Sequence, residues 1–480
     1  MKWDVVIGLE IHVELSTKSK LFCGCSTAFG APPNTQCCPI CTGMPGTLPV
    51  TNEKVLEYAV RAGLALNCDI LRRNQFDRKN YFYPDLPSAY QISQLHLPFA
   101  KNGKVTTTLP NGDPLTVQIH QIHMEEDAGK LIHSATGDRS YPDYNRCSVP
   151  LIEIVSKPDI HTAAEAIAYL SHIKSKLEYL GVSDCQMQEG SLRADVNLSV
   201  KPADSETLGT RTEMKNLNSF RAIERAISFE SKRQIEVLES GGEVLQETRR
   251  WDDNRGQSFA MRSKENAPDY RYFPDPNLPP LVIDDAFLAY CKSLQPEFAA
   301  EKAARFVTEY GLNAKDAATI TANRIIAELF ENTAKLAKSA KEVSAWILGD
   351  LMYQMNSQSV EPTELKIPPP AFATFSDAIT DGQINRTAGK EVFAYLFGGG
   401  DDIASFIQKA GLAQISDDSV IASAVDDALA ANEKAVAEYR AGKDKAFGFL
   451  VGQVMKSLKD KGNPAQINAL LKQKLENKEG

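Results

Sequence analysis

The chain has 480 residues and a formal net charge of −9, and 43% of its residues are hydrophobic. Its length is sufficient for about three domains of ~150 residues, and its composition is that of a globular protein. No apolar run approaches the ~18–20 residues that span a bilayer, and acidic residues interrupt the apolar segment near the N-terminus, which argues against a signal peptide. We therefore expect a cytoplasmic protein, and the acidic balance argues against general nucleic-acid binding.

A strand is predicted over residues 5–15, because apolar and polar side chains alternate along this stretch. Its polar face carries Glu10, His12 and Glu14, which stand ~7 Å apart because a strand rises ~3.4 Å per residue. An exposed sheet face would carry similar charges, so this strand alone leaves a surface face and a metal–nucleotide site equally open. Further acidic strands along the chain favour the site.

The nine cysteines do not fit a disulfide framework, since their number is odd and no export signal is expected. Cys23 and Cys25 form one short-spaced pair and Cys38 and Cys41 form another, with glycine and proline around both. Two such pairs on turns suit a tetrahedral, all-thiolate zinc site without an open coordination position. We predict a structural zinc knuckle, although Cys37 could replace Cys38, and buried free thiols are the alternative to zinc.

A loop that combines basic, aromatic and proline residues follows a helix predicted over 51–66, and it includes Lys79. Its charges and rings would suit a nucleotide or an RNA end, by ion pairing and stacking. Taken by itself, a purely structural loop is the simpler interpretation of this composition.

Two later segments with strand character bring isolated carboxylates. Glu125 follows a hairpin signal at Asn111 and Gly112, and Glu153 stands alone in a run of leucine, isoleucine and valine. A lone carboxylate in such a run is costly to bury without a cation or hydrogen bonds. Glu153 is therefore the most diagnostic single residue after His12.

Interleaved acids and bases recur on two further predicted strands. The alternation places Arg193 and Asp195 on one face of the first strand, and Glu213 and Lys215 on one face of the second. One such strand is commonly a surface face, whereas several together are typical of a lined concavity. Helices are predicted over 161–180 and 220–238, so the first region alternates helices with strands.

Strand patterns stop near Gln295, and Ala-, Lys- and Glu-rich helices continue to the end of the chain, interrupted by prolines 368–370 and glycines 398–400. We predict an α+β fold, in which a large mixed or antiparallel-sheet domain precedes an all-helical domain and a small helical tail. Residues 440–480 hold nine basic and four acidic residues. This basic end suggests an anionic partner, although a solvated lysine-rich helix is an equal alternative.

The chain contains neither a Walker A motif nor a Rossmann glycine fingerprint, and the protein-kinase signatures are also missing. What remains is carboxylates and histidine on a sheet, with lysine and arginine interleaved. Magnesium prefers one or two carboxylates plus phosphate oxygens, and basic side chains neutralise a transferring phosphoryl group. The sheet face could therefore hold a magnesium nucleotide without a glycine loop. General acid–base hydrolysis fits less well beside so many positive charges.

Long motifs distributed over the whole chain resemble the B subunit family of the tRNA-dependent aspartyl/glutamyl amidotransferase. They are GLEIHVEL at 8–15, CPIC at 38–41, DRKNYFYPD at 77–85, HMEEDAGK at 123–130, VPLIEIVSKPD at 149–159, EGSLRADVN at 189–197, RTEMKNLNSF at 211–220 and GKDKAFGFLVGQVMK at 442–456. The resemblance implies a cradle domain over 1–293, a helical domain over 294–405 and a tRNA-binding tail domain over 406–480.

The activity that the resemblance implies is an ATP-dependent carbon–nitrogen ligation with glutamine as the amido donor. The chain would phosphorylate the side-chain carboxylate of mischarged Glu-tRNA(Gln) or Asp-tRNA(Asn), and ammonia from a partner amidase, the A subunit, would then displace the phosphate. A small C subunit would complete the heterotrimer. The sequence shows no amidase signature of its own, which agrees with this division of labour. Two rivals stay open: a non-catalytic tRNA-binding scaffold and a small-molecule carboxylate–amine ligase.

The family pattern also implies residue roles. Magnesium would bind His12, Glu125 and Glu153, with Glu10 and Lys79 completing the catalytic group. The ATP phosphates or the tRNA 3′ end would contact Lys79, Arg193, Asp195 and Lys215. Structural zinc would bind Cys23, Cys25, Cys38 and Cys41, a site that some family members lack.

Overall fold

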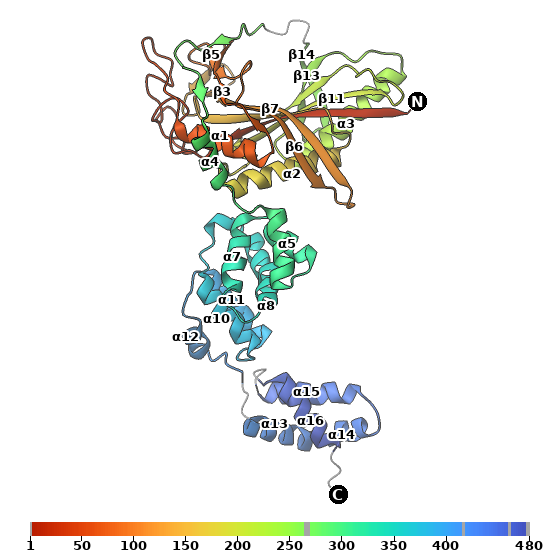
Figure 1. The fold of residues 1–480 in the computed structure, drawn as a ribbon. Helices are drawn as coiled ribbons and strands as arrows, with labels where there is room; N and C mark the ends of the chain where they lie inside the picture. Colours follow the sequence, from red (N-terminus) through yellow and green to blue (C-terminus); the bar gives the residue numbers. More distant parts are fainter. Residues whose placement is uncertain (1, 264–268, 415–417, 459–461, 477–480) are drawn as a thin grey trace. The chain divides into compact units, whose positions relative to one another are not determined.

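A nine-stranded sheet organises the first of two compact units, Met1–Phe298 (Figure 1). The structure is a computed structural model that describes residues 2–263, 269–414, 418–458 and 462–476. In spatial order the strands of this sheet are β14 (Gln257–Ser263), β13 (Glu247–Asp252), β12 (Thr212–Lys215), β11 (Leu192–Pro202), β1 (Trp3–Glu14), β10 (Pro150–Ser156), β7 (Pro114–Glu126), β6 (Ala100–Thr108) and β2 (Asp69–Ile70). Every neighbouring pair is antiparallel except β12 and β13, which run parallel, so the sheet is mixed, as predicted.

Strand β1 lies in the middle of the sheet, between β11 and β10. Its apolar side chains are buried, with Ile7 and Ile11 0% exposed, and they belong to one hydrophobic core shared with helices α1, α2 and α3. The predicted alternation is confirmed, because Glu10, His12 and Glu14 stand on the opposite face and are only partly buried. One face of the sheet therefore packs on helices, and the other is left to polar groups.

The described residues of this unit form four helices: α1 (Glu53–Ala65), α2 (Ala163–Leu180), α3 (Phe220–Glu239) and α4 (Asp285–Ser293). The first three lie within two residues of their predicted limits. Asn52, Thr162 and Ser219 cap their N-termini, and each side chain accepts a hydrogen bond from a backbone N–H of the first turn. The caps and the apolar periodicity thus fix the helices that support the sheet.

Three small sheets are also formed by the described residues of this unit. They are formed by β15 (Phe273–Pro274), β4 (Asp77–Asn80) and β5 (Tyr90–Ser93), by β16 (Leu281–Val282) and β3 (Arg73–Asn74), and by β8 (Lys130–His133) and β9 (Ser140–Asp143). Strand β5 packs against β7. The predicted hairpin at Asn111 and Gly112 is confirmed, since it joins β6 to β7 with Gly112 at φ +93°.

In the second unit, Ala299–Gly480, the elements that the described residues form are helices joined by short loops. Its helices are α5 (Ala299–Tyr310), α6 (Ala314–Thr321), α7 (Arg324–Ala334), α8 (Ala340–Trp346), the π-helix η2 (Ile347–Leu351), α9 (Met352–Gln358), the 3-10 helix η3 (Pro362–Glu364), α10 (Pro369–Thr380), α11 (Arg386–Phe397), α12 (Ile403–Lys409), α13 (Asp418–Ala431), α14 (Glu433–Arg440), α15 (Lys445–Ser457) and α16 (Pro464–Glu476). Two separate hydrophobic clusters hold them together, one between Phe306 and Ile407 and one between Ile421 and Leu475.

The predicted fold class is therefore confirmed, whereas the boundaries at residues 293 and 405 stay predictions. Three of the basic tail residues, Lys459, Lys461 and Lys478, lie outside the described residues. Among the helices that the structure describes, none combines the length and the apolar composition needed to cross a membrane.

Candidate active site and cysteine cluster

A transverse row of polar residues crosses the central strands of the nine-stranded sheet. His12 on β1 stands opposite Glu153 on β10, and Glu153 stands opposite His123 on β7. Glu125 follows His123 on the same face, because side chains two apart on a strand point the same way. His12 Nε2 lies 3.6 Å from Glu125 Oε1 and 3.5 Å from Glu153 Oε2. One ligand atom each from His12, Glu125 and Glu153 lie within 4.8 Å of one another.

The electrostatics of this row favour an ionised carboxylate at its centre. Burial opposes the charge of Glu153, but the imidazoles of His123 and His12 hold the pKa of this carboxyl well below its ordinary value. In turn, burial would lower the pKa of His12, yet the hydrogen bond and the charge of Glu153, with that of Glu125, raise it to about 8. The row thus combines two carboxylates with two imidazoles, and the ligand atoms of His12, Glu125 and Glu153 have the type and spacing that would hold a divalent cation once His12 is neutral.

A second acidic group lies on the same face, one strand further across the sheet. Ligand oxygens of Glu10, Asp195 and Glu213 also lie within 4.8 Å of one another. Lys215 pairs with Asp195 and, at 3.0 Å, with Glu213, and Asn197 donates a hydrogen bond to Glu10 at 2.9 Å. Burial first, and then the charge of Glu153, raise the pKa of Glu10. Further carboxylates near Glu10 act in the same direction, so this group favours an added positive charge.

Arg193 belongs to a third group rather than to the second. It pairs with Asp127 Oδ2, and its Nη2 lies 3.5 Å from Glu14 Oε1, while Arg146 Nε lies 3.3 Å from the same Asp127 oxygen. Burial, followed by the charge of Asp127, raises the pKa of Glu14 to about 8 against the opposing effect of Arg193. Arg193 thus extends the polar face past His12, which it directly opposes in the β1–β11 pairing.

Lys79 lies apart from these carboxylates, on the small sheet formed by β15, β4 and β5. Its Nζ stands 5.0 Å from the centroid of the Tyr270 ring, and among the described residues no hydrogen bond or ion pair joins Lys79 to the acidic groups. Burial first, and then the charges of Glu125 and Glu153, raise the pKa of the phenol of the neighbouring Tyr272. The small sheet therefore places Lys79 beside an aromatic ring rather than within the acidic groups.

The four cysteines of the predicted knuckle meet at one point, where their Sγ atoms lie within 4.8 Å of one another. Cys38 is the fourth member, since Cys37 lies outside the group, with its Sγ 3.8 Å from Asn145 Oδ1. A hydrogen bond from Cys23 is the main reason that the pKa of Cys41 is lowered to about 4. The set therefore has the ligands and the spacing of a tetrahedral thiolate site.

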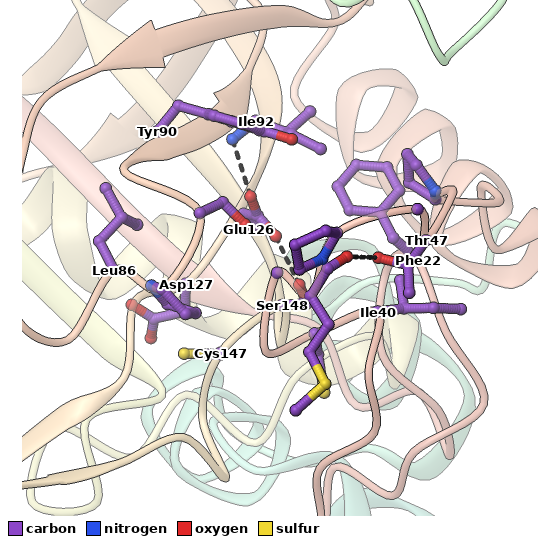
Figure 2. Close-up of a pocket in the computed structure, with 18 residues that line it drawn as sticks. Phe22, Ile40, Thr47, Leu86, Tyr90, Ile92, Glu126, Asp127, Cys147 and Ser148 are labelled. Atoms are coloured by element: carbon purple, nitrogen blue, oxygen red, sulfur yellow. Dashed lines mark hydrogen bonds between the residues drawn. The ribbon is translucent and has the colours of Figure 1, made fainter.

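A cavity of about 230 Å³ separates the knuckle from the end of β7. Figure 2 shows Glu126 inside it, held between Ile92 and Ser148. The backbone N–H of Ile92 donates to Glu126 Oε1 at 2.9 Å, and the Ser148 hydroxyl donates to its other oxygen. Strand β7 therefore carries Glu125 of the acidic row and, directly after it, Glu126 of this cavity.

The sequence analysis assigns no role to His123 or Glu213, although it places Glu213 on a strand face of the predicted concavity. His123 is the residue of the row that could have been found, because it stands two positions before Glu125 on one strand. Grouping Glu213 with Glu10 requires the pairing of β11 with β12, which the sequence does not reveal.

Comparisons with known proteins identify the family of the chain. Residues 5–289 match the family model of the GatB/GatE catalytic domain, and residues 328–475 match that of the GatB domain. A relative from Lachnoclostridium phytofermentans, named as the B subunit of aspartyl/glutamyl-tRNA(Asn/Gln) amidotransferase, is 54% identical over 473 residues, covering 98% of this chain and 99% of its own. Proteins of the same name from Caldicellulosiruptor bescii (53% identity; 99% and 100% of the two chains) and Lachnospira eligens (51%; 98% and 99%) are similar over their whole length.

The sheet with its acidic face is thus the catalytic domain of an amidotransferase component. The coverage by both family models and by full-length relatives then fixes the family. The chain belongs to the family of the aspartyl/glutamyl-tRNA(Asn/Gln) amidotransferase B subunit, which confirms the resemblance. A non-catalytic scaffold would not require the acidic strands to share one face, as these do.

Proposed function

We propose that this protein phosphorylates the side-chain carboxylate of glutamate or aspartate on a mischarged tRNA, using ATP, and then amidates it with ammonia released from glutamine by a partner protein. The observation that carries the proposal is the shared face of the sheet, where His12, Glu125 and Glu153 converge beside Glu10, Asp195 and Glu213. The names of the relatives supply the tRNA substrates, Glu-tRNA(Gln) and Asp-tRNA(Asn).

The row of His12, Glu125 and Glu153 fits magnesium, because its ligand atoms lie close together and the neighbouring imidazoles lower the pKa of Glu153. When bound, the ion would neutralise charge on the transferring phosphoryl group. Lys215, on strand β12, would stabilise the phosphate oxygens of ATP. Activation is needed because oxide is a poor leaving group, whereas the phosphate of an acyl phosphate leaves as a stabilised anion.

A pocket beside Glu10 supports the nucleotide proposal. Its volume is about 200 Å³, and it is lined by Gly8, Val155, Leu208 and Asn197 among others. Asn197 donates to Glu10 through its amide nitrogen, while its Oδ1 is buried without a hydrogen-bond partner in the described residues. A nucleotide base would fill such a pocket, and an exocyclic amine would satisfy the free oxygen. The triphosphate would then extend over the acidic groups.

The four-cysteine group fits zinc, since it offers four thiols within 4.8 Å and the hydrogen bond from Cys23 lowers the pKa of Cys41, which favours its thiolate. We assign this zinc a structural role, because the site presents four protein ligands and no position for substrate. Because Cys41 lines the Glu126 cavity, the bound zinc would stabilise one wall of that cavity.

The partners follow from the chemistry and from the family. Ammonia must reach the activated carboxylate un-ionised, so its source should be a protein bound to this chain. We propose that an amidase is this source, and that the amidase and a small stabilising protein form a heterotrimer with this chain. The basic tail helices would bind the tRNA backbone. Both partners should copurify with this chain, and full activity of the isolated chain with glutamine would contradict the assignment.

The roles of the acidic row can be tested by ATP-dependent amidation of mischarged tRNA. Glu125→Gln and His12→Ala should abolish amidation while leaving tRNA affinity within a few-fold of the unmodified complex. His120→Ala, at an exposed position of the same sheet, is the matched control and should retain activity. Equal loss of tRNA binding and amidation in the two site variants would contradict the assigned roles.

A further inference from the structure

Lys20 is a fully buried lysine, 0% exposed, in the segment that connects β1 to the cysteine knuckle. Its Nζ contacts Cys41 Sγ at 3.5 Å and the backbone oxygen of Tyr144 at 3.3 Å. Within the described part of the chain, Lys20 pairs with no carboxylate. Its cationic group is therefore enclosed next to a cysteine cluster instead of next to an acid.

A buried ammonium is costly unless a negative charge lies beside it. The four thiols would supply that charge, because zinc bound by four thiolates keeps a formal excess of two negative charges. Cys41 also accepts a hydrogen bond from the Cys38 amide at 3.2 Å, so two N–H groups converge on its sulfur. The environment of Lys20 is explained if the knuckle is an anionic metal–thiolate centre.

We propose that Lys20 is a positioning residue for the cysteine metal site, where it offsets the charge of the thiolates and orients Cys41. This inference rests on the zinc assignment proposed above and goes beyond it, since Lys20 is no ligand. Outer groups that hydrogen-bond to ligands typically account for 10–100-fold in metal affinity.

The backbone around Lys20 is arranged to hold the ammonium in place. Its N–H donates to Cys25 O at 3.0 Å, and its carbonyl accepts from the Asn52 side chain at 3.1 Å. The following residue, Leu21, donates to Ser148 O at 2.8 Å. Tyr144 and Ser148, the two ends of the segment 144–148, thus accept hydrogen bonds from Lys20 and Leu21. Ser148 in turn donates a hydrogen bond to Glu126.

A consequence of this arrangement is that the metal site and the wall of the Glu126 cavity are mechanically linked through Lys20. Loss of the ammonium should weaken the knuckle and loosen residues 144–148 together. A substitution that keeps the size of the side chain but removes its charge separates this effect from simple cavity formation.

The test uses the full chain in the complex in which it purifies, and it measures zinc content and the rate of zinc release to a chromophoric chelator. Lys20→Met is the main variant, Lys20→Gln keeps a donor without the charge, and Lys18→Met is the control at an exposed lysine two residues earlier. We expect zinc release about 10–100-fold faster in Lys20→Met. Lys20→Gln should lie between Lys20→Met and the control, which should match the unmodified protein.

Hydrogen exchange supplies a second readout that does not depend on activity. Amides of residues 144–148 should exchange faster in Lys20→Met, and chelation of zinc from the unmodified protein should have the same effect. If Lys20→Met misfolds, the intermediate release rate of Lys20→Gln still tests the proposal. Unchanged release from a zinc-loaded Lys20→Met protein overturns the role of Lys20, whereas an unmodified protein without zinc overturns the zinc assignment itself.

Discussion

His123 Nε2 lies 2.9 Å from Glu153 Oε2, across the pairing of β7 with β10. A carboxylate has no proton to give, so the imidazole donates through Nε2, and Glu125 Oε2 stands 3.7 Å from the same nitrogen. The other ring nitrogen, Nδ1, is buried without a hydrogen-bond partner in the described residues. The ring is therefore oriented by the two carboxylates that we assign to magnesium, and it fixes them in return.

The first prediction concerns this contact. His123→Asn is too short to reach Glu153, so both carboxylates should lose their fixed orientation and bind the cation more weakly. We expect a 10–100-fold rise in the magnesium concentration required for amidation, with unchanged tRNA affinity. Mn²⁺ titration followed by electron paramagnetic resonance measures the same loss directly. Equal Mn²⁺ affinity in the variant and in the unmodified protein would rule out a positioning role for His123.

Much of this site could be predicted from the sequence, because strand periodicity assigns faces. The alternation in β1 places Glu10 and His12 together opposite an apolar core, and the apolar run around Glu153 marks its carboxylate as unusual. Periodicity says nothing about which strands are neighbours, however. His123 opposes Glu153, and Glu213 reaches Glu10, only because of the pairing of β7 with β10 and of β11 with β12.

The second prediction concerns Lys215, the cation between Asp195 and Glu213. The variant Lys215→Met leaves the carboxylates of Asp195 and Glu213 without a cationic partner. These carboxylates should then repel the triphosphate of ATP. We expect kcat/KM for ATP to fall at least ~10-fold, a loss of ~1.4 kcal/mol in transition-state stabilisation. Lys104→Met, at an exposed lysine on β6 of the same sheet, is the control and should have no effect. A normal kcat/KM for ATP in Lys215→Met would place the phosphates elsewhere.

The third prediction tests the pocket beside Glu10. A Cβ added to Gly8 would meet only Ser156, at 3.9 Å, so Gly8→Ala fits without strain and Gly8→Val projects methyl groups into the pocket. We expect KM for ATP to rise little in Gly8→Ala and at least ~10-fold in Gly8→Val, because the larger side chain occupies the space of the base. Thermal melting checks that both variants fold. A normal KM for ATP in a folded Gly8→Val variant would exclude this pocket as the nucleotide site.

The two cysteine pairs and the helices were also predictable, since short spacing and apolar periodicity are local signals. Lys20 shows where such signals end. In the sequence it stands beside Lys18 with no distinguishing pattern, yet one is fully buried and the other exposed. Only the fold reveals that the chain passes between the knuckle and the segment 144–148.

The last prediction concerns pH and the helical unit. Lys302, Arg305 and Lys335 surround Glu331, with N–O distances of 2.9, 3.0 and 3.0 Å. Burial alone would raise the pKa of Glu331, but the hydrogen bonds from these three cations lower it to about 2 from an ordinary value of 4.5. A lowered carboxyl pKa contributes stability that is fully present above the unfolded value and is lost as pH falls through the folded one.

Glu331→Gln should therefore destabilise this unit at pH 6 by roughly 1–2 kcal/mol after allowance for solvent screening. The difference in unfolding free energy between the variant and the unmodified protein should narrow as pH falls from about 4.5 towards 2, because protonation of Glu331 then removes the same charge. Hydrogen exchange of α5–α7, compared between variant and unmodified protein at each pH, measures the difference. Glu309→Gln removes an exposed carboxylate 2.9 Å from the same Arg305 and should have an effect below ~0.5 kcal/mol. If the stability difference between Glu331→Gln and the unmodified protein stays constant down to pH 2, the charge of Glu331 does not stabilise the helices.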